Sequence, residues 1–187
     1  DLALHAIRAS GDDQMAFQVQ GGQLTTHRCT FSGYTLNSNY LFDLDQAKAS
    51  ILRTEISENV LSSGSARRLV SARGSETRLV IRDSMIRCNR TASGNTSGSG
   101  MVELRGSRGL IQRCSVVENG ILQGAATTGM VAASTTGTQG IRGWLFIEDT
   151  TLSSNEIDRR GGGSSTCGGL VINASSSSKT QGIVAEA

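Results

Sequence analysis

Proline is absent from this chain of 187 residues, and aromatic residues account for only 4% of it. No apolar run approaches the roughly 18 residues that a membrane-spanning helix needs, and no signal peptide is evident. The chain has two histidines and no CxxC motif, which argues against a zinc site. Its formal net charge is only +2 and few aromatic side chains could stack on bases, which argues against nucleic-acid binding. We therefore expect no cofactor, no membrane span and no nucleic-acid partner.

Glycine is abundant, with 23 residues, and serine and threonine are frequent. This mixture favours short strands joined by tight polar turns over long helices. The apolar share of 37% reaches the usual value for a folded protein once glycine is added. The length suits one domain, so we expect a single all-β domain over residues 1–187. Because the chain begins at Asp1, we expect a processed form or a segment of a longer chain or assembly.

An outline of nine residues occurs five times along the chain. The first place is β-branched, the fourth is small (Cys, Thr or Ser), the sixth is apolar, and the ninth is Asn in every copy but the first, which has Tyr34. The copies are THRCTFSGY from Thr26, ILRTEISEN from Ile51, IRDSMIRCN from Ile81, IQRCSVVEN from Ile111 and IEDTTLSSN from Ile147. Successive first places lie 25, 30, 30 and 36 residues apart. Such self-similarity predicts a stacked repeat architecture, in which each repeat forms one rung.

Two corners follow from the spacing of the apolar residues. The first place and the residue two before it point the same way in a strand, but the next apolar residue comes five places later, at an odd step. The chain must therefore bend near the fourth place, and we expect one column of small residues there: Cys29, Thr54, Ser84, Cys114 and Thr150. Asparagine tolerates left-handed dihedrals and bonds to the same amide one layer above. A second corner is therefore expected at Asn59, Asn89, Asn119 and Asn155.

A third apolar segment follows each second corner, after a Gly/Ser/Thr-rich stretch of variable length. These segments begin at Met15, Leu41, Leu69, Met101, Met130 and Leu170. Three strands per rung and about five to six rungs result, with insertions confined to the stretch after the second corner. The alternatives are a flat or sandwiched all-β domain with coincidental spacing and a leucine-rich solenoid, although no LxxLxL outline occurs.

The segments HRCTFSGY and TCGGLVIN resemble the repeats of polymorphic outer membrane proteins, within the right-handed parallel β-helix (pectate-lyase-like) superfamily. The resemblance covers about residues 2 to 175. It implies an all-β, right-handed, single-stranded parallel β-helix. It carries little information on function, because this fold serves enzymes, adhesins and passive stalks alike.

A local likeness to pectin methylesterases lies near the N-terminus, in IRASGDDQMAF and CTFSGYTL. It implies that Asp12 or Asp13 lies near a substrate groove. The GYQD of that family reads GYTL at Gly33–Leu36, so its Gln and its general-acid Asp are absent, and no VDF.FG segment supplies a nucleophile. GDD is also a fragment of the polygalacturonase pattern, but neighbouring aspartates in a strand face opposite ways. We therefore predict no catalytic residue and no enzymatic activity.

Charged residues recur at the third place of the repeat. Asp83 and Asp149 occupy it in rungs separated by Arg113, which disfavours a calcium pair. The residues Arg28, Arg53, Arg82 and Arg113 form a possible strip facing an anion or an acidic polysaccharide. The competing interpretation is a solvated face, in which Glu55, Asp83, Glu148 and Asp149 alternate with these arginines; we favour it.

The four cysteines permit two disulfides, and three sequons permit glycosylation. Cys29 and Cys114 are expected about 14 Å apart, too far for a bridge, while Cys88 and Cys167 are less constrained. Candidate glycan acceptors are Asn95, Asn173 and Asn89; Asn95 is preferred to Asn89, which is also a corner residue and should be poorly accessible.

We expect a non-enzymatic extracellular or cell-surface module such as a stalk, coat, adhesin or appendage component. Its expected partners are other copies or neighbouring segments that stack on its ends, since exposed strand edges need a cover and no capping helix is evident. The segment from Ile183 resembles the start of another rung. A carbohydrate-binding or inactive member of a polysaccharide-active family is the alternative. A third possibility is an enzyme with catalytic residues outside this segment.

Overall fold

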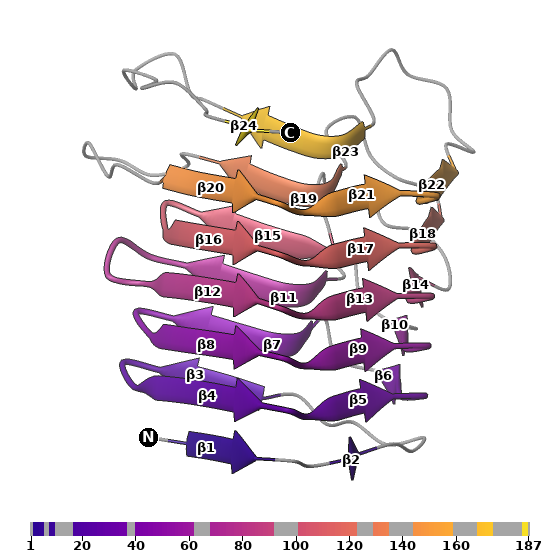
Figure 1. Ribbon diagram of the computed structural model, residues 1–187. Helices are drawn as coiled ribbons and strands as arrows, with labels where there is room; N and C mark the ends of the chain where they lie inside the picture. Colours follow the sequence, from indigo (N-terminus) through magenta and orange to yellow (C-terminus); the bar gives the residue numbers. More distant parts are fainter. Residues whose placement is uncertain are drawn as a thin grey trace.

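The computed structural model describes residues 2–5, 8–9, 17–36, 40–61, 68–91, 101–122, 129–134, 144–158, 168–173 and 185–186. This part of the chain is all-β and contains no helix. Its strands form four parallel sheets, and successive layers lie one above another from the N-terminal to the C-terminal end (Figure 1). The expected parallel β-helix-like solenoid is thereby confirmed.

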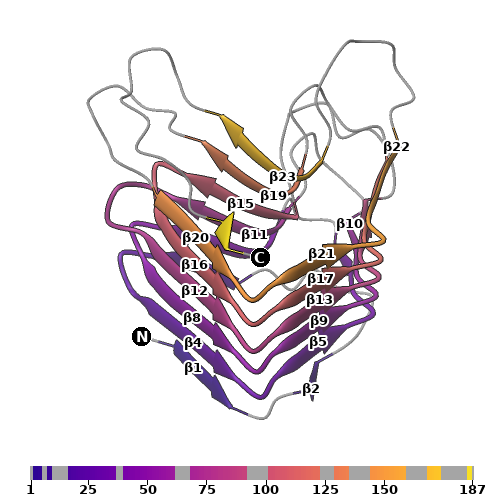
Figure 2. The ribbon, with the colours of Figure 1, turned by 45° about the horizontal axis from the view of Figure 1, so that its top comes forward.

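The chain passes through the four sheets in the order A, B, D and C. Sheet A contains β1 (Leu2–His5), β4 (Gln23–His27), β8 (Lys48–Leu52), β12 (Arg78–Arg82), β16 (Arg108–Gln112), β20 (Trp144–Glu148) and β24 (Ala185–Glu186). Sheet B contains β2 (Arg8–Ala9), β5 (Thr30–Ser32), β9 (Glu55–Ser57), β13 (Met85–Arg87), β17 (Ser115–Val117) and β21 (Thr151–Ser153). Sheets A and B meet in a V, and sheet C lies across its open side (Figure 2).

Sheets D and C complete each rung. Sheet D contains β6 (Thr35–Leu36), β10 (Val60–Leu61), β14 (Arg90–Thr91), β18 (Gly120–Leu122) and β22 (Glu156–Asp158). Sheet C contains β3 (Phe17–Gln20), β7 (Tyr40–Asp45), β11 (Arg68–Arg73), β15 (Val102–Arg105), β19 (Gly129–Ser134) and β23 (Gly168–Asn173).

The prediction of three strands per rung is wrong, because sheet D adds a fourth. Its strands are only two or three residues long and directly follow the asparagine corner. In the first four of these strands one residue points inward and is buried: Leu36, Leu61, Thr91 and Ile121. A two-residue strand is too short to show alternating hydrophobicity, so the sequence analysis did not distinguish the strands of sheet D from the polar stretch that follows.

The predicted register is correct. In sheet B, Thr30 pairs with Glu55, Glu55 with Met85, and Met85 with Ser115. The fourth places directly before them therefore form one column, and the same relation continues to Thr150. The 36-residue spacing of the last repeat has a different origin from the one expected. Its extra length lies between β19 and β20, after the third strand segment, in residues 135–143.

Each corner contains a left-handed residue, and in the central rungs the residue that follows the third and eighth places is buried. The left-handed residues are those at the third place, such as Arg53 (φ 48°) and Asp83 (φ 52°), and at the eighth, such as Glu58 (φ 57°). The asparagines do not adopt this conformation, so the prediction of left-handed corner asparagines is wrong by one position. A third corner of the same kind joins sheet C to sheet A, with positive φ at Gly21, Gln46, Gly74 and Gly106.

The buried polar residues of the corners bond from rung to rung. We call Asn59, Asn89, Asn119 and Asn155 the asparagine ladder. The amide oxygen of each of the last three accepts the backbone N–H of the asparagine one rung earlier, at 3.0–3.1 Å. At the fourth place, the Thr54 N–H donates to the Ser84 hydroxyl at 3.1 Å. These bonds satisfy backbone groups that the corners remove from the sheets.

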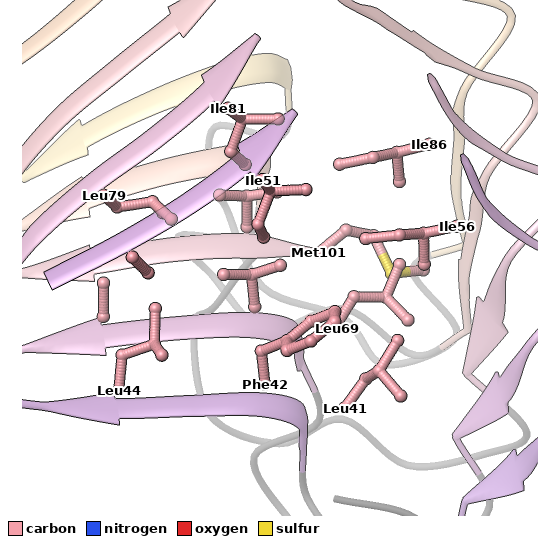
Figure 3. Packing of buried hydrophobic residues seen from close by; sticks show 14 of the residues in the cluster. Leu41, Phe42, Leu44, Ile51, Ile56, Leu69, Leu79, Ile81, Ile86 and Met101 are labelled. Carbon is pink, nitrogen blue, oxygen red and sulfur yellow. The ribbon is translucent and has the colours of Figure 1, made fainter. Parts of the chain in front are cut away.

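The core consists of the inward-facing apolar columns of the four sheets. Figure 3 shows Ile51, Ile56 and Ile81 facing Phe42 and Leu69 across the interior of the rungs. Every one of these side chains is fully buried. Near the N-terminal end, Phe17, Phe31 and Phe42 contact one another, with ring centroids 5.2–5.5 Å apart. Burial of such columns at roughly 25 cal/mol per Å² is the main stabilising contribution to the stack.

Gly109 is the smallest member of an inward column in sheet A, and a side chain at this position would force its neighbours to move. A Cβ at this position would lie 2.3 Å from Leu104 Cδ2 and 3.1 Å from Leu145 Cδ1. We expect Gly109→Ala to lower the free energy of unfolding by about 1–3 kcal/mol through overpacking. Gly120→Ala, whose Cβ would meet only Arg90 Cγ at 3.6 Å, is the matched control.

Chemical denaturation of both variants and of Gly109→Ala combined with Leu104→Ala tests this account. The double variant should be more stable than the sum of the single changes, because the smaller residue 104 makes room for the new methyl group. Strict additivity would contradict the proposed clash.

Candidate functional site

Only three of the four arginines predicted to form a basic strip lie in one column, and two aspartates share that column with them. Arg28, Arg53 and Arg113 lie in one column at the corner between sheets A and B, and Asp83 and Asp149 occupy the same column in the remaining rungs. We call these five residues the corner strip. They are all exposed, and their left-handed backbone directs each of them away from the interior. The fourth predicted member, Arg82, lies on the outer face of sheet A instead.

The corner strip is largely charge-balanced on its C-terminal side. Arg113 donates two hydrogen bonds to Asp83, from Nε to Oδ1 at 2.6 Å and from NH2 to Oδ2 at 3.0 Å. These bonds hold the pKa of Asp83 below its usual value and raise the pKa of Arg113. In the adjacent sheet B, Arg87 of β13 donates a hydrogen bond from Nε to Glu55 Oε1 of β9 at 3.0 Å. A shallow depression of about 550 Å³ follows this corner, and it is lined by residues of both signs. The solvated-face interpretation therefore fits Arg113 better than an anion site does.

Two histidines lie beside the N-terminal part of the corner strip. His5 and His27 occupy adjacent rungs of sheet A, with ring centroids 5.0 Å apart. Partial desolvation lowers the pKa of His27, and His5, Arg28 and Arg53 lower it further.

The outer face of sheet A carries a second basic column, which the sequence analysis missed. Lys48, Arg78 and Arg108 pair with one another in register on adjacent strands, and we call them the basic ladder. Within the described ranges no carboxylate lies within 4.0 Å of these cations. They stand three residues before the first place of the repeat. That constant offset is the signal that would have revealed them.

An apolar column runs beside the basic ladder. Val80 and Leu110 pair in register and are half-buried, and Phe146 continues their column on β20. Trp144 continues the column of the basic ladder itself, beside Arg108. The Trp144 and Phe146 side chains are 46% and 47% exposed, and their rings meet edge to face at 4.9 Å. The other aromatic side chains considered for ligand stacking differ, because Tyr34 is buried and Tyr40 lies under Arg68, 5.8 Å from its guanidinium carbon.

The far side of the apolar column contains Arg82 and Gln112. The Nε of Arg82 is buried and has no hydrogen-bond partner in the described part of the chain. Gln112 donates its amide to Glu148 at 2.6 Å. In β12, therefore, Arg78 and Arg82 flank Val80 on both sides.

The outer face of sheet C holds a separate network of ion pairs around two buried carboxylates, Asp43 and Glu103. Arg68 pairs with Glu103, which also receives Arg105 at 3.1 Å, and Arg73 pairs with Asp43 at 3.0 Å. Burial raises the pKa of Asp43, and Arg73 opposes that shift. Each carboxylate is held by at least one arginine on a neighbouring strand. Paired in this way, the buried charges connect β7, β11 and β15, and removing one partner would leave an uncompensated charge.

The predicted modification sites differ in their surroundings. Asn89 is fully buried, and its amide nitrogen lies within 3.0 Å of three acceptors: Asn119 Oδ1, Ile56 O and Arg87 O. A glycan on this nitrogen is incompatible with the folded ladder. Asn95 lies outside the described residues, and so does the side chain of Asn173, so their glycosylation stays a prediction.

The three cysteines in the described residues form no disulfide with one another. Cys29 and Cys114 are buried in the fourth-place column three rungs apart, and Cys88 is partly buried. The thiols of Cys29 and Cys114 lie 3.4 Å from the carbonyls of Leu4 and Ile81, so they replace the hydroxyls of Thr and Ser at the corner. Cys167, Asp12, Asp13 and Ile183 lie outside the described residues.

Comparison with known proteins adds no assignment to these surfaces. Neither a protein-family model nor a curated protein nor a solved structure matches the chain. Across the described ranges, His, Cys, Asp and Glu side chains nowhere gather in a group of three or more that could hold a metal ion. The structure, as far as it is described, includes no helix with the length and apolar character needed to cross a membrane.

Proposed function

We propose that this chain is a non-enzymatic extracellular scaffold: a right-handed β-helix of about five to six rungs that stacks end to end with further β-helical layers. The partner is a second copy or another segment of the same polypeptide. This is the role of a stalk, coat or appendage component. The resemblance to pectate-lyase-like and polymorphic outer membrane protein repeats is compatible with it.

The observation that carries the proposal is the exposure of inward-facing apolar residues in the terminal rungs. Leu2 faces the interior and is 41% exposed, whereas Leu24, its partner one rung further on, is completely buried. Towards the other end, Leu145 and Ile147 of β20, the last strand of sheet A before the two-residue β24, are only partly buried, although Ile111 in the preceding rung is 1% exposed. An additional layer at either end would bury these side chains.

The polar columns supply the second support, because they make each rung a template for the next. A terminal asparagine retains donors or acceptors for one more asparagine, and a terminal parallel strand retains unpaired N–H and C=O groups. Repeat proteins gain stability from each such interface. Stacking therefore adds the same contacts that already hold the rungs together.

Two lysine substitutions on β1 test the proposal. Leu2→Lys places a charge on the end face, whereas Ala3→Lys places it on the exposed outer side of the same strand. We expect the unaltered chain to associate increasingly with protein concentration in analytical ultracentrifugation. Leu2→Lys should weaken this association at least about tenfold, since a buried unpaired charge is costly, and Ala3→Lys should not.

Two results would reject end-to-end stacking. One is an unaltered chain that remains monomeric at every soluble concentration. The other is an equal effect of the two lysine substitutions, which would assign association to the side of the stack.

A further inference from the structure

We propose that His5 and His27 form a binding site for a divalent transition-metal ion such as Zn²⁺ or Ni²⁺ on the outer face of sheet A, near the N-terminal end of the stack. Each histidine would supply one imidazole nitrogen, and water would occupy the remaining coordination positions. A bound ion would fasten β1, the first strand of sheet A, to β4. This inference goes beyond the scaffold function and does not depend on it.

The placement of the two imidazoles carries the first step. The chain contains only two histidines, and the parallel pairing of β1 with β4 puts them directly beside each other. Neighbouring strands lie about 4.8 Å apart, so in-register side chains on the same face can reach one ligand. His5 is exposed and His27 is half-buried. The two residues are far apart along the chain, so only the register of the rungs reveals the pair.

The distance between the rings carries the second step. Zinc binds a histidine nitrogen at about 2.0–2.1 Å, which places the ion about 3.1 Å from the ring centroid. Two imidazoles in a tetrahedral arrangement therefore have centroids about 5 Å apart. The centroids of His5 and His27 are 5.0 Å apart, with the ring planes tilted by 44°. At an accessible position each ring can turn about χ2 to present either nitrogen. The two rings thus have the separation that a shared ion requires.

The chemistry of the donors selects the kind of ion. Imidazole suits Zn²⁺, Ni²⁺ and Cu²⁺, whereas Ca²⁺ and Mg²⁺ require oxygen ligands. Within the described ranges no Cys, Asp or Glu side chain joins the two histidines in a group of three or more that could hold a metal ion. Two protein ligands leave two positions open on a four-coordinate ion. The site is therefore an open one, unlike the closed four-ligand centre of a structural zinc domain.

The charges around the pair set a limit on its affinity. Arg28 and Arg53 are exposed in the corner strip, and both act electrostatically on His27. On the next strand, β8 places the uncharged Leu52 beside His27. Positive charge near the imidazoles repels a divalent cation. Removing these arginines should therefore tighten metal binding, whereas it would weaken the binding of an anion.

Isothermal titration calorimetry with ZnCl₂ tests the site in the 187-residue chain, prepared without a polyhistidine tag. We expect one Zn²⁺ per chain. His5→Gln and His27→Gln should each weaken binding at least about tenfold, since even an outer-shell partner of a metal ligand typically contributes that much. Both positions lie on the outer face, so without zinc both variants should unfold at the temperature of the parent. Saturating ZnCl₂ should raise the unfolding temperature of the parent and not that of His5→Gln.

Three further variants locate the ion. Cys88 is a partly accessible thiol that donates to Glu118 at 3.3 Å, so it is the competing zinc ligand. Cys88→Ser should retain zinc binding within about twofold. Thr25→His adds a third imidazole on the outer face, two residues from His27, and should tighten binding at least about tenfold. Arg28→Gln combined with Arg53→Gln should tighten it about threefold.

Several results would overturn the proposal. These are the absence of zinc binding, a loss in only one of the two histidine variants, and a loss in Cys88→Ser as large as theirs. Binding of Ca²⁺ as tight as that of Zn²⁺ would also overturn it, because carboxylates would then be the ligands. A stoichiometry of one Zn²⁺ per two chains would assign the ion to a contact between copies and would equally reject the site.

Discussion

Replacing Asn89 by Ala is expected to lower the free energy of unfolding by about 3–5 kcal/mol. Its amide oxygen accepts from the backbone and side-chain nitrogens of Asn59, at 3.1 and 2.9 Å. Its amide nitrogen contacts Asn119 Oδ1 and the carbonyl of Ile56, both at 2.9 Å. The side chain is completely buried, so alanine would leave several donors and acceptors without water or protein partners.

Urea denaturation followed by circular dichroism measures the loss, and Asn155→Ala is the control of the same residue type. Asn155 lies at the end of the asparagine ladder and is only partly buried, so water can replace the bonds that it makes. We expect a loss of about 1–2 kcal/mol there. If the two substitutions cost the same, the asparagine ladder does not act as a cooperative network.

Replacing Ile86 by Asp is expected to destabilise the fold by at least about 4 kcal/mol, which prevents folding if the parent is marginally stable. Ile86 is 1% exposed, between Ile56 and Val116 in the inward column of sheet B. A carboxylate placed there loses its hydration and gains no cation, and the packing of the isoleucine is lost as well.

The adjacent residue provides the control. Met85 is 40% exposed on the opposite side of β13, so Met85→Asp should change the free energy of unfolding by less than about 1 kcal/mol. Soluble yield and thermal unfolding of the two variants give the comparison. Similar losses at the two positions would mean that the two sides of β13 have been assigned the wrong way round.

The register of the rungs was predictable because the buried residues obey a strict pattern. An apolar residue at the sixth place and a small one at the fourth are required by the interior in every rung, whatever the neighbouring loops do. The spacing of Phe31, Ile56 and Ile86 along the chain is therefore sufficient to identify the inward column of sheet B. The asparagine ladder was equally predictable, because an asparagine recurs at the ninth place so that each amide can bond to an identical one in the next rung.

The corner conformations and sheet D were less predictable. Among the described residues, ten with a left-handed backbone are not glycine and only four are glycine, because the stacked strands on either side enforce the corner and local preference does not. Sheet D has strands such as Val60–Leu61, which are too short to carry a pattern. In both cases the neighbouring rungs impose the conformation.

The exposed charges of sheet A and its corner show most clearly which features follow from the sequence and which follow only from the tertiary structure. By itself, the sequence determined that five repeats stack in register, which side chains enter the core and which asparagines and small residues line the corners, because those positions are selected by burial in every rung. Only the tertiary structure decided how many sheets close each rung and which exposed charges become neighbours. Arg113 binds Asp83 whereas Arg108 has no carboxylate beside it in the described part of the chain, although both belong to the same repeat. An exposed position on an outer face can hold almost any residue at little cost in stability. The pairing of charges there therefore depends on the geometry of adjacent rungs and not on a pattern along the chain.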